Sequence, residues 1–452
     1  MHDASRTLGN EYWLVNVAAV IEHDGKFEVR HHTSIHVVGN AIAWIGDCAH
    51  SSLTSDAKVR VIDAHDAYAL PGFINTHVHS ALLPNHGRGD DYAGAPIYQH
   101  RVAQGVMFSP DEIAVLAGFG AVQAALMGST TIVDNYEHED ASVGYLEHVG
   151  IRCYVSERVH DADLAVLAYS GRYEYQHAIR EQTLSRQHNL EDRYAANGDD
   201  DLMRVMIGPH GPDTCSRELL AECSRLAKDR QQLVAIHLSQ GAHERDQVSS
   251  RDGMDSVELL DSCGLLGPWL LAGHCLSLPQ SRIARLAQAK AHVIQMVGAN
   301  LKSGCRLQGD EFAQAGANVC VATDNMMPDM LDCLRLYALV NRLDSPHPDN
   351  YDASRALASA TINPALAIGR SHDLGRLAKG YKADIVLIEP NPVVSVPASG
   401  ELQHIVYNYR RDDIRDVIVN GEFVVKDRAP VNADLMQLRQ EALRVFAVHD
   451  HD

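Results

Sequence analysis

Eight short apolar segments alternate with helical segments through the middle of the chain, and this alternation restricts the fold more than any other feature. The apolar segments are rich in Val, Ile and Leu, as buried strands are. Strands that alternate with helices form parallel sheets, and eight such units suggest an α/β fold, a (β/α)8 barrel of the TIM type. The predicted strands are YALPGFINTH (68–77), STTIVDN (129–135), IRCYVSE (151–157), MRVMIGPH (203–210), QLVAIH (232–237), WLLAGH (269–274), AHVIQMV (291–297) and NVCVATD (318–324).

The segments between these strands carry apolar residues at spacings of three and four, which predicts amphipathic helices. Ser109 and Ser216 stand where helix N-caps are expected, and Pro110 follows Ser109 at the first helical position. The segment 171–201 predicts a long helix and a surface loop. The other predicted helices are PDEIAVLAGFGAVQAALMG (110–128), SRELLAECSRLAKDR (216–230), MDSVELLDSCG (254–264) and LPQSRIARLAQAK (278–290).

Both ends of the chain predict short β-strands. Four β-rich runs lie between residues 12 and 68, and two more cover 382–390 and 414–427, the last with an Asn-Gly turn in VNGEF. We expect the two ends to pair into one β-sandwich. A chain of 452 residues is long enough for a barrel and an accessory domain. The expected division is therefore a barrel over 69–372 and a β-sandwich built from 1–68 plus 373–452.

Charge and cysteine content restrict the partners and the location. The formal net charge of -20, with no Lys/Arg cluster, argues against binding to nucleic acid or to an anionic membrane. No apolar run approaches the ~20 residues of a membrane-spanning helix, and the start lacks a signal-peptide pattern. Nine scattered cysteines without a CxxC pair predict reduced thiols and no cysteine-based zinc site. We expect a cytoplasmic protein that acts on a small molecule.

Four of the predicted strands bring His77 with His79, His237, His274 and Asp324 to their C-terminal ends, and all five residues are ionisable. A single histidine at such a place is more often a hydrogen-bonded core or surface residue. In a barrel, however, the C-terminal ends of all strands meet on one face. Imidazoles and one carboxylate gathered there suit a divalent metal, with zinc expected and iron or manganese as alternatives. Metal-bound hydroxide at neutral pH makes a hydrolase the natural interpretation.

An ordered set of motifs along nearly the whole chain carries a family resemblance. They are LPGFINTHVHSALL, GSTTIVD, IGPHGPDTCS, AIHLSQ, LAGHC, NLKSG, ATDN and LGRLAKGYKADIVLIE. In these motifs and their order the sequence resembles the amidohydrolase superfamily, in its branch of metal-dependent deaminases and triazine chlorohydrolases. The resemblance implies that His77, His79, His237 and Asp324 bind one metal. It also implies that His274 sits beside the bound water and that Asp324 accepts the proton of the attacking water.

The same resemblance suggests residues on the substrate side. His210 matches a position that contacts substrate in the family. The alternative is a loop histidine whose ring is hydrogen-bonded within the protein. Asn300 and Lys302 match the NxK pattern, but QMVGA replaces the usual preceding residues, and an exposed loop lysine is the alternative. The resemblance also suggests a homodimer.

Gln240 departs from the family pattern. The deaminases carry H-x-x-E, in which the glutamate shuttles a proton to a ring nitrogen, whereas this chain has HLSQ at 237–240. An amide has no proton to transfer at neutral pH. Three explanations stay open: another donor, an easily departing leaving group such as a halide, or cleavage of an amide, urea or carbamate C–N bond. The candidate donors are Glu244, His243, His210 and Glu137.

A metal-binding protein without catalytic activity is the alternative of another class. Two further groups of residues have structural interpretations. Met326, Met327 and Met330 follow the predicted metal aspartate, and we expect core filling there rather than a pocket wall. His86 and Asp90 lie in a polar loop after the first histidine pair, where a surface position is the default interpretation.

Overall fold

The structure, a computed structural model, describes residues 11–47, 59–88, 90–91, 98, 107–198, 200–325, 327–397 and 399–449, with Asp344 described by its backbone only. Met326 lies outside the described residues. Among the described residues, no helix is both long and apolar enough to cross a membrane. The eight described cysteines are all free thiols.

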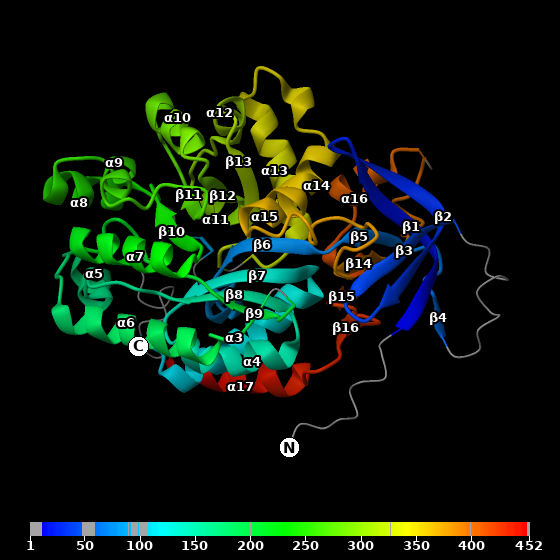
Figure 1. Cartoon of the computed structure of the whole chain (residues 1–452), viewed down its shortest axis with the longest axis horizontal. Coiled ribbons are helices and arrows are strands. Elements are labelled where there is room, and N and C mark those ends of the chain that lie inside the picture. Colours follow the sequence, from blue (N-terminus) through cyan, green and yellow to red (C-terminus); the bar gives the residue numbers. More distant parts are fainter. Residues whose placement is uncertain are drawn as a thin grey trace.

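Two four-stranded parallel sheets form the centre of the molecule (Figure 1). All eight predicted segments contain a strand. The first sheet has the order β6-β7-β8-β9 and the second the order β10-β11-β12-β13. The strands are β6 Phe73–Val78, β7 Ser129–Tyr136, β8 Arg152–Glu157, β9 Met203–Val205, β10 Val234–Leu238, β11 Leu270–His274, β12 His292–Met296 and β13 Asn318–Ala322.

Isolated parallel bridges join the two sheets on both sides. Val78 pairs with Asp324, and Ile207 pairs with Val234. Inside the curve of the strands, alternate residues form an apolar cluster to which most of the strands contribute, among them Ile74, Val133, Tyr154, Met206, Ala235, Leu271, Ile294 and Cys320. The α/β class is therefore correct, and parallel strands with ends on a common face are present as expected.

The first predicted strand is divided into two, which corrects the expected run 68–77. β5 Tyr68–Pro71 pairs with β14 Ile385–Ile388, whereas β6 begins at Phe73. Gly72 lies between them, where an added Cβ would come within 2.2 Å of Thr130 Oγ1. The chain can pass from one sheet to the other here only because this residue has no side chain.

Helices cover the outside of the central strands, with α3, α4, α6 and α17 together along one side in Figure 1. The predicted caps are present: Ser109 forms a capping box with Glu112, and Ser216 accepts a hydrogen bond from Leu219 N. The helices are α3 Pro110–Leu126, α4 Glu139–Val149, α5 Leu164–Ser170, α6 His177–Arg193, α7 Arg217–Arg230, α8 Ala242–Asp252, α9 Ser256–Ser262, α10 Gln280–Gln288, α11 Val297–Lys302, α12 Gly309–Gln314, α13 Met330–Asp344, α14 Ala353–Ala360, α15 Ile362–Ala367, α16 Glu401–Tyr407 and α17 Leu435–His449, with 3-10 turns η2 Ser80–Asn85, η4 Pro348–Asn350 and η5 Arg411–Asp413.

A third, mixed sheet joins the two ends of the chain. Its order is β17-β16-β15-β14-β5-β1-β2-β3, and β4 pairs with β1. The predicted Asn-Gly turn is present, because Asn420 and Gly421 have φ of 52° and 83° between β15 and β16. The strands not yet given are β1 Glu11–His23, β2 Lys26–Val38, β3 Ala41–Asp47, β4 Arg60–Asp63, β15 Ile414–Val419, β16 Glu422–Lys426 and β17 Ala429–Pro430.

The C-terminal helix α17 packs on the helical layer around the central strands. Phe446 meets Phe108 edge to face at a centroid distance of 6.1 Å. His449 Nε2 lies 3.0 Å from Glu112 Oε1. Ala442 and Val445 are buried in the same apolar cluster as residues of α3. The end of the chain therefore contacts α3 of the middle region.

Candidate active site

Three buried histidines converge at the C-terminal ends of β6 and β10. The Nε2 atoms of His77 and His79 are 3.3 Å apart, and each lies 3.2 Å from His237 Nε2. Among the described residues, this is the group of His, Cys, Asp or Glu side chains that can hold a metal ion. The structure thus brings together residues 160 positions apart in the sequence, as the strand-end pattern predicts.

Strand alternation and two backbone carbonyls orient the imidazoles. Ala235 belongs to the inner apolar cluster, and two residues further along β10 His237 points to the same side. His237 Nδ1 donates to His210 O at 2.7 Å, and His79 Nδ1 donates to Asn135 O at 2.6 Å. Each of these bonds fixes the tautomer that leaves Nε2 free to ligate.

The donor set fits a divalent metal. Ligand nitrogens around a tetrahedral zinc lie roughly 3.3 Å apart, which is the spacing of the three Nε2 atoms. Burial and neighbouring histidines or Arg158 lower the pKa of His77, His79 and His237 well below the usual value. The three imidazoles are therefore neutral, as metal ligation requires.

Asp324 lies beside this cluster, just past the end of β13. Ala322 faces the inner cluster, so the side chain two residues later continues on the same side. Asp324 Oδ1 is 3.4 Å from His79 Nε2, and Asp324 N donates to His77 O at 3.0 Å. Its backbone is left-handed, with φ of 61°. Burial raises the pKa of the Asp324 carboxyl to about 7, although Arg158 opposes the shift.

The alternation of side chains along β11 would turn His274 away from the inner face of the strands. Its backbone is left-handed, with φ of 68°, and this turn directs the side chain to the histidine cluster. Its Nδ1 donates to Asn300 Oδ1 at 2.8 Å, while its Nε2 is buried and has no hydrogen-bond partner among the described residues. Burial lowers the pKa of His274 to about 4, so the ring is neutral at pH 7. The described contact of the Asn300 side chain is therefore with His274, although the sequence suggested a substrate contact.

The other substrate-side candidates also have protein partners. His210 Nδ1 lies 2.9 Å from Thr214 Oγ1, and the His210 ring meets the His237 ring edge to face at 5.0 Å. Lys302 forms an ion pair with Asp90 in the loop after the first histidine pair. The ion pair ties that loop to the end of α11. The substrate roles of His210 and Lys302 stay predictions.

Glu244 is fully buried in the first turn of α8 and lies behind Gln240. Its two carboxylate oxygens accept hydrogen bonds from Ser239 N at 2.8 Å and Gln240 N at 2.7 Å. Burial and the nearby Asp213 raise the pKa of the Glu244 carboxyl to about 7. Among the other donor candidates, Glu137 lies 3.8 Å from His160 Nε2.

Arg158 is a buried residue of the site that the sequence analysis missed. Only 2% of it is exposed, its Nη2 lies 3.4 Å from His79 Nε2, and its guanidinium stacks over the Tyr136 ring at 4.4 Å. No carboxylate among the described residues forms an ion pair with it. Arg158 directly follows β8, so the strand-end rule that selected the histidines would also have selected it.

The two described methionines that follow Asp324, Met327 and Met330, pack in different surroundings. Met330 is fully buried in the main core, as predicted. Met327 contacts Gly298, whose added Cβ would come within 2.4 Å of Met327 Sδ.

Comparison with known proteins agrees with this geometry. The model of the amidohydrolase family matches residues 68–424, which confirms the resemblance in the sequence motifs. A 5-methylthioadenosine/S-adenosylhomocysteine deaminase from Thermococcus kodakarensis is 30% identical over 379 residues, or 82% of this chain and 85% of that protein.

Two solved structures are similar over almost their whole length. An adenosine deaminase from Xanthomonas campestris with bound zinc has a TM-score of 0.85 at 20% identity, covering 98% of this chain and 99% of the other. Atrazine chlorohydrolase from Arthrobacter aurescens, complexed with zinc, has a TM-score of 0.81 at 22% identity, covering 96% and 99%. At these identities the comparison establishes a shared fold.

Proposed function

Because the chain belongs to the amidohydrolase family, we propose that it is a zinc-dependent deaminase that removes an amino group from the purine ring of an adenosine-like nucleoside. The chain is a metal-dependent hydrolase of the branch that displaces amines or other leaving groups from nitrogen-rich heterocycles. The nucleoside is supported by the 30% identical relative, a deaminase of 5-methylthioadenosine and S-adenosylhomocysteine.

The convergence of three neutral Nε2 atoms beside Asp324 is the observation that carries the proposal. His77, His79, His237 and Asp324 would hold the metal. When bound, the metal supplies Lewis acidity, which makes water a nucleophile at neutral pH. A non-catalytic metal-binding protein would not need His274, whose neutral ring sits beside these ligands at a centroid distance of 5.4 Å from His237.

His274 and Asp324 divide the proton handling. The Nδ1–H of His274 is committed to Asn300, so Nε2 carries the lone pair and accepts a hydrogen bond from the attacking water or from the amine. Asp324 accepts the proton that the water loses, and this proton is then available to the departing nitrogen. The carbon–nitrogen bond breaks, a carbon–oxygen bond forms, and ammonia leaves.

Gln240 favours a second candidate, displacement of a leaving group better than ammonia. An amide donates and accepts hydrogen bonds but cannot protonate a ring nitrogen at neutral pH. A halide leaves without protonation, so hydrolysis of a halogenated heterocycle has less need of a proton donor at position 240. Cleavage of an amide, urea or carbamate C–N bond also has little need of a proton donor at position 240.

Release assays separate these candidates. Zinc-loaded protein is incubated with adenosine, 5-methylthioadenosine, a chlorotriazine and an aryl urea, and ammonia, chloride and amines are measured. Ammonia from a nucleoside supports the first candidate and chloride the second. Failure of every compound, with stoichiometric zinc bound, contradicts both and favours the metal-binding alternative.

Asp324→Asn tests the base. We expect a loss of about 10²- to 10⁴-fold in kcat, which is the usual contribution of a general base. Asp349→Asn is the matched control, because Asp349 is exposed. Near-normal turnover by the Asp324 variant would refute its role.

We also propose that the two central sheets close into a (β/α)8 barrel over 69–372, with a β-sandwich from 1–68 plus 373–452. Support for closure comes from the two parallel bridges, Val78–Asp324 and Ile207–Val234. We propose a homodimer as the assembly, which light scattering on the purified protein tests.

A further inference from the structure

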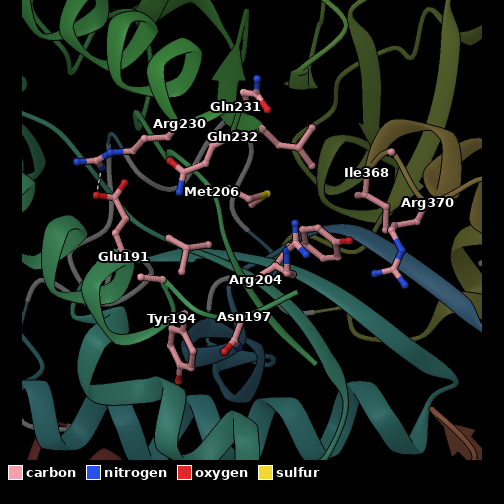
Figure 2. Close-up of a pocket in the computed structure, with 15 residues that line it drawn as sticks. Glu191, Tyr194, Asn197, Arg204, Met206, Arg230, Gln231, Gln232, Ile368 and Arg370 are labelled. Carbon is pink, nitrogen blue, oxygen red and sulfur yellow. Dashed lines mark hydrogen bonds and ion pairs between the residues drawn. The ribbon is translucent and has the colours of Figure 1, made fainter. Parts of the chain in front are cut away.

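The cavity shown in Figure 2 has a volume of about 410 Å³ and lies at the N-terminal side of the central strands, because its wall includes residues 230–233, which precede β10. Two of its arginines are paired within the protein: Arg230 with Glu191 (dashed line in Figure 2) and Arg370 with Asp373. A buried side chain with a polar atom open to a ligand is found instead at the other side of the strands, beside the candidate active site.

His160, three residues after β8, lies on the inner face of the strands. Tyr154 of β8 belongs to the inner apolar cluster, and Arg158, four residues later, contacts the histidine cluster. The chain stays extended up to this point, since Val159 pairs with Pro209 in an isolated parallel bridge. Because every second side chain of an extended chain points to the same face, His160 continues the row of Tyr154 and Arg158. It stands one step further from the apolar cluster than Arg158.

Two side chains of neighbouring strands lie beside His160. The His160 ring meets the ring of His210 edge to face at a centroid distance of 6.3 Å, and the His210 ring meets that of His237 at 5.0 Å. Glu137, which directly follows β7, brings its Oε1 to 3.8 Å from His160 Nε2. The pair of His160 and Glu137 is therefore one imidazole away from His237, the proposed metal ligand.

The hydrogen bonds of His160 leave one ring nitrogen open. Its Nδ1 donates to Ala162 O at 2.8 Å, so Nδ1 carries the hydrogen of the neutral ring. Nε2 then carries a lone pair, and it is buried without a hydrogen-bond partner among the described residues. Burial lowers the pKa of His160, although Glu137 opposes the shift, so the ring is neutral at pH 7.

Both members of the pair are therefore hydrogen-bond acceptors. A carboxylate oxygen and an unprotonated imidazole nitrogen cannot bond to each other, and their separation of 3.8 Å is too long for a hydrogen bond. A buried acceptor without a donor costs free energy, so the arrangement indicates a donor group from outside the protein. A ligand that fits offers two adjacent O–H or N–H groups.

We propose that His160 and Glu137 form a specificity site that binds the vicinal diol of a ribose. The proposal rests on the proposed nucleoside deaminase activity, in which the purine lies at the metal centre and the sugar extends past His210. The two adjacent hydroxyl groups of a ribose each donate one hydrogen. One hydroxyl group bonds to His160 Nε2 and the other to a Glu137 oxygen. A nucleoside without the diol leaves both acceptors without partners.

Two pairs of nucleosides test the diol. Ammonia release by zinc-loaded protein gives kcat/KM for adenosine and for dideoxyadenosine, which lacks both hydroxyl groups of the diol. We expect adenosine to be preferred at least about tenfold, because buried polar groups of the protein stay unpaired with the other substrate. Inosine and dideoxyinosine, in which the amino group is already replaced, should show the same preference in Kd by isothermal titration calorimetry.

Variants locate the contact. His160→Phe keeps a ring but has no acceptor, and Glu137→Leu removes the carboxylate; each should lower the preference for the diol about threefold or more. His160→Gln keeps an acceptor oxygen and should retain more of the preference than His160→Phe. His292→Phe is the matched control, because His292 is also buried and both of its ring nitrogens have protein partners. The preference is a ratio, so a loss of folded protein does not change it.

The outcomes separate this proposal from the proposed function. Ammonia from both adenosine and dideoxyadenosine at equal kcat/KM overturns the diol site and leaves the deaminase function intact. No ammonia from either nucleoside, with inosine bound more tightly than dideoxyinosine, contradicts the deaminase function and supports the diol site. No preference in either assay, or the same preference in His160→Phe as in His292→Phe, overturns the proposal.

Discussion

Asn300→Ala tests whether the hydrogen bond from His274 Nδ1 sets the direction of the His274 imidazole, for which we propose a catalytic role. Both residues are buried, at 2% and 3% exposure, and the bond is 2.8 Å long. Removing the acceptor leaves a buried donor without a partner, which costs about 1–3 kcal/mol. If the variant must pay this free energy to hold the His274 ring in its present orientation during turnover, kcat/KM falls by roughly 5- to 150-fold.

Asn300→Asp separates orientation from charge. A carboxylate within a few ångströms raises the pKa of an imidazole by about 1–3 units, so the pKa of His274 rises from about 4 to roughly 5–7. Below that new pKa the ring becomes a cation, and the neutral form that accepts a hydrogen bond at Nε2 is lost. Activity of the Asp variant therefore falls between pH 8 and pH 5, whereas the Ala variant shows a uniform loss.

The assay is kcat/KM for the substrate found in the release screen, measured from pH 5 to pH 9 on protein of known zinc content. Asn318→Ala is the matched control, because Asn318 Nδ2 lies 2.9 Å from His292 Nδ1 in another Asn–His pair. Two results refute the reasoning: a wild-type pH profile for Asn300→Asp, or equal kcat/KM for Asn300→Ala and Asn318→Ala.

Three further changes have defined outcomes. A chelator should lower the thermal midpoint in calorimetry, because metal at 1,000 times its Kd stabilises the fold by about 4 kcal/mol, and an unchanged midpoint contradicts metal binding. Burial raises the pKa of Glu244 from 4.5 to about 7, so the folded state holds a proton that the unfolded state has lost between these values. The free energy of unfolding then falls as pH rises through this window. Urea denaturation should show a smaller fall for Glu244→Gln than for the wild type, and the same pH dependence in both proteins contradicts the prediction. Gln240→Glu should raise ammonia release relative to chloride release, and an unchanged ratio means that the side chain does not face the substrate.

The sequence could predict the central strands and the converging histidines because both follow from local rules. Apolar runs of strand length mark the strands. Because every second side chain of a strand points to the same face, His237 follows Ala235 on the inner face, and Asp324 follows Ala322. The same rules could not show the break at Gly72. That break depends on β5 pairing with β14, which lies more than 300 residues away in the sequence.

The partners of the polar side chains depend on contacts that no local pattern contains. Asn300 reaches His274 across 26 positions, and only because His274 takes a left-handed turn. Lys302 pairs with Asp90 across 212 positions. The NxK pattern could locate both residues after β12, but their described contacts are with protein groups that were unknown at the level of sequence.

Glu244 bears most directly on the absent glutamate at Gln240. α8 begins at Ala242, so Glu244 is its third residue, and its carboxylate reaches back past the N-cap Gly241 to the N–H groups of Ser239 and Gln240. A carboxylate whose two oxygens already accept backbone hydrogen bonds fixes the loop and has little freedom to carry a proton to a substrate. Among the three explanations for Gln240, relocation of the shuttle to Glu244 is therefore the weakest. His243, His210 and Glu137 then remain as candidate donors, beside a substrate with little need for ring protonation, and the backbone N–H of Gln240 is held by Glu244.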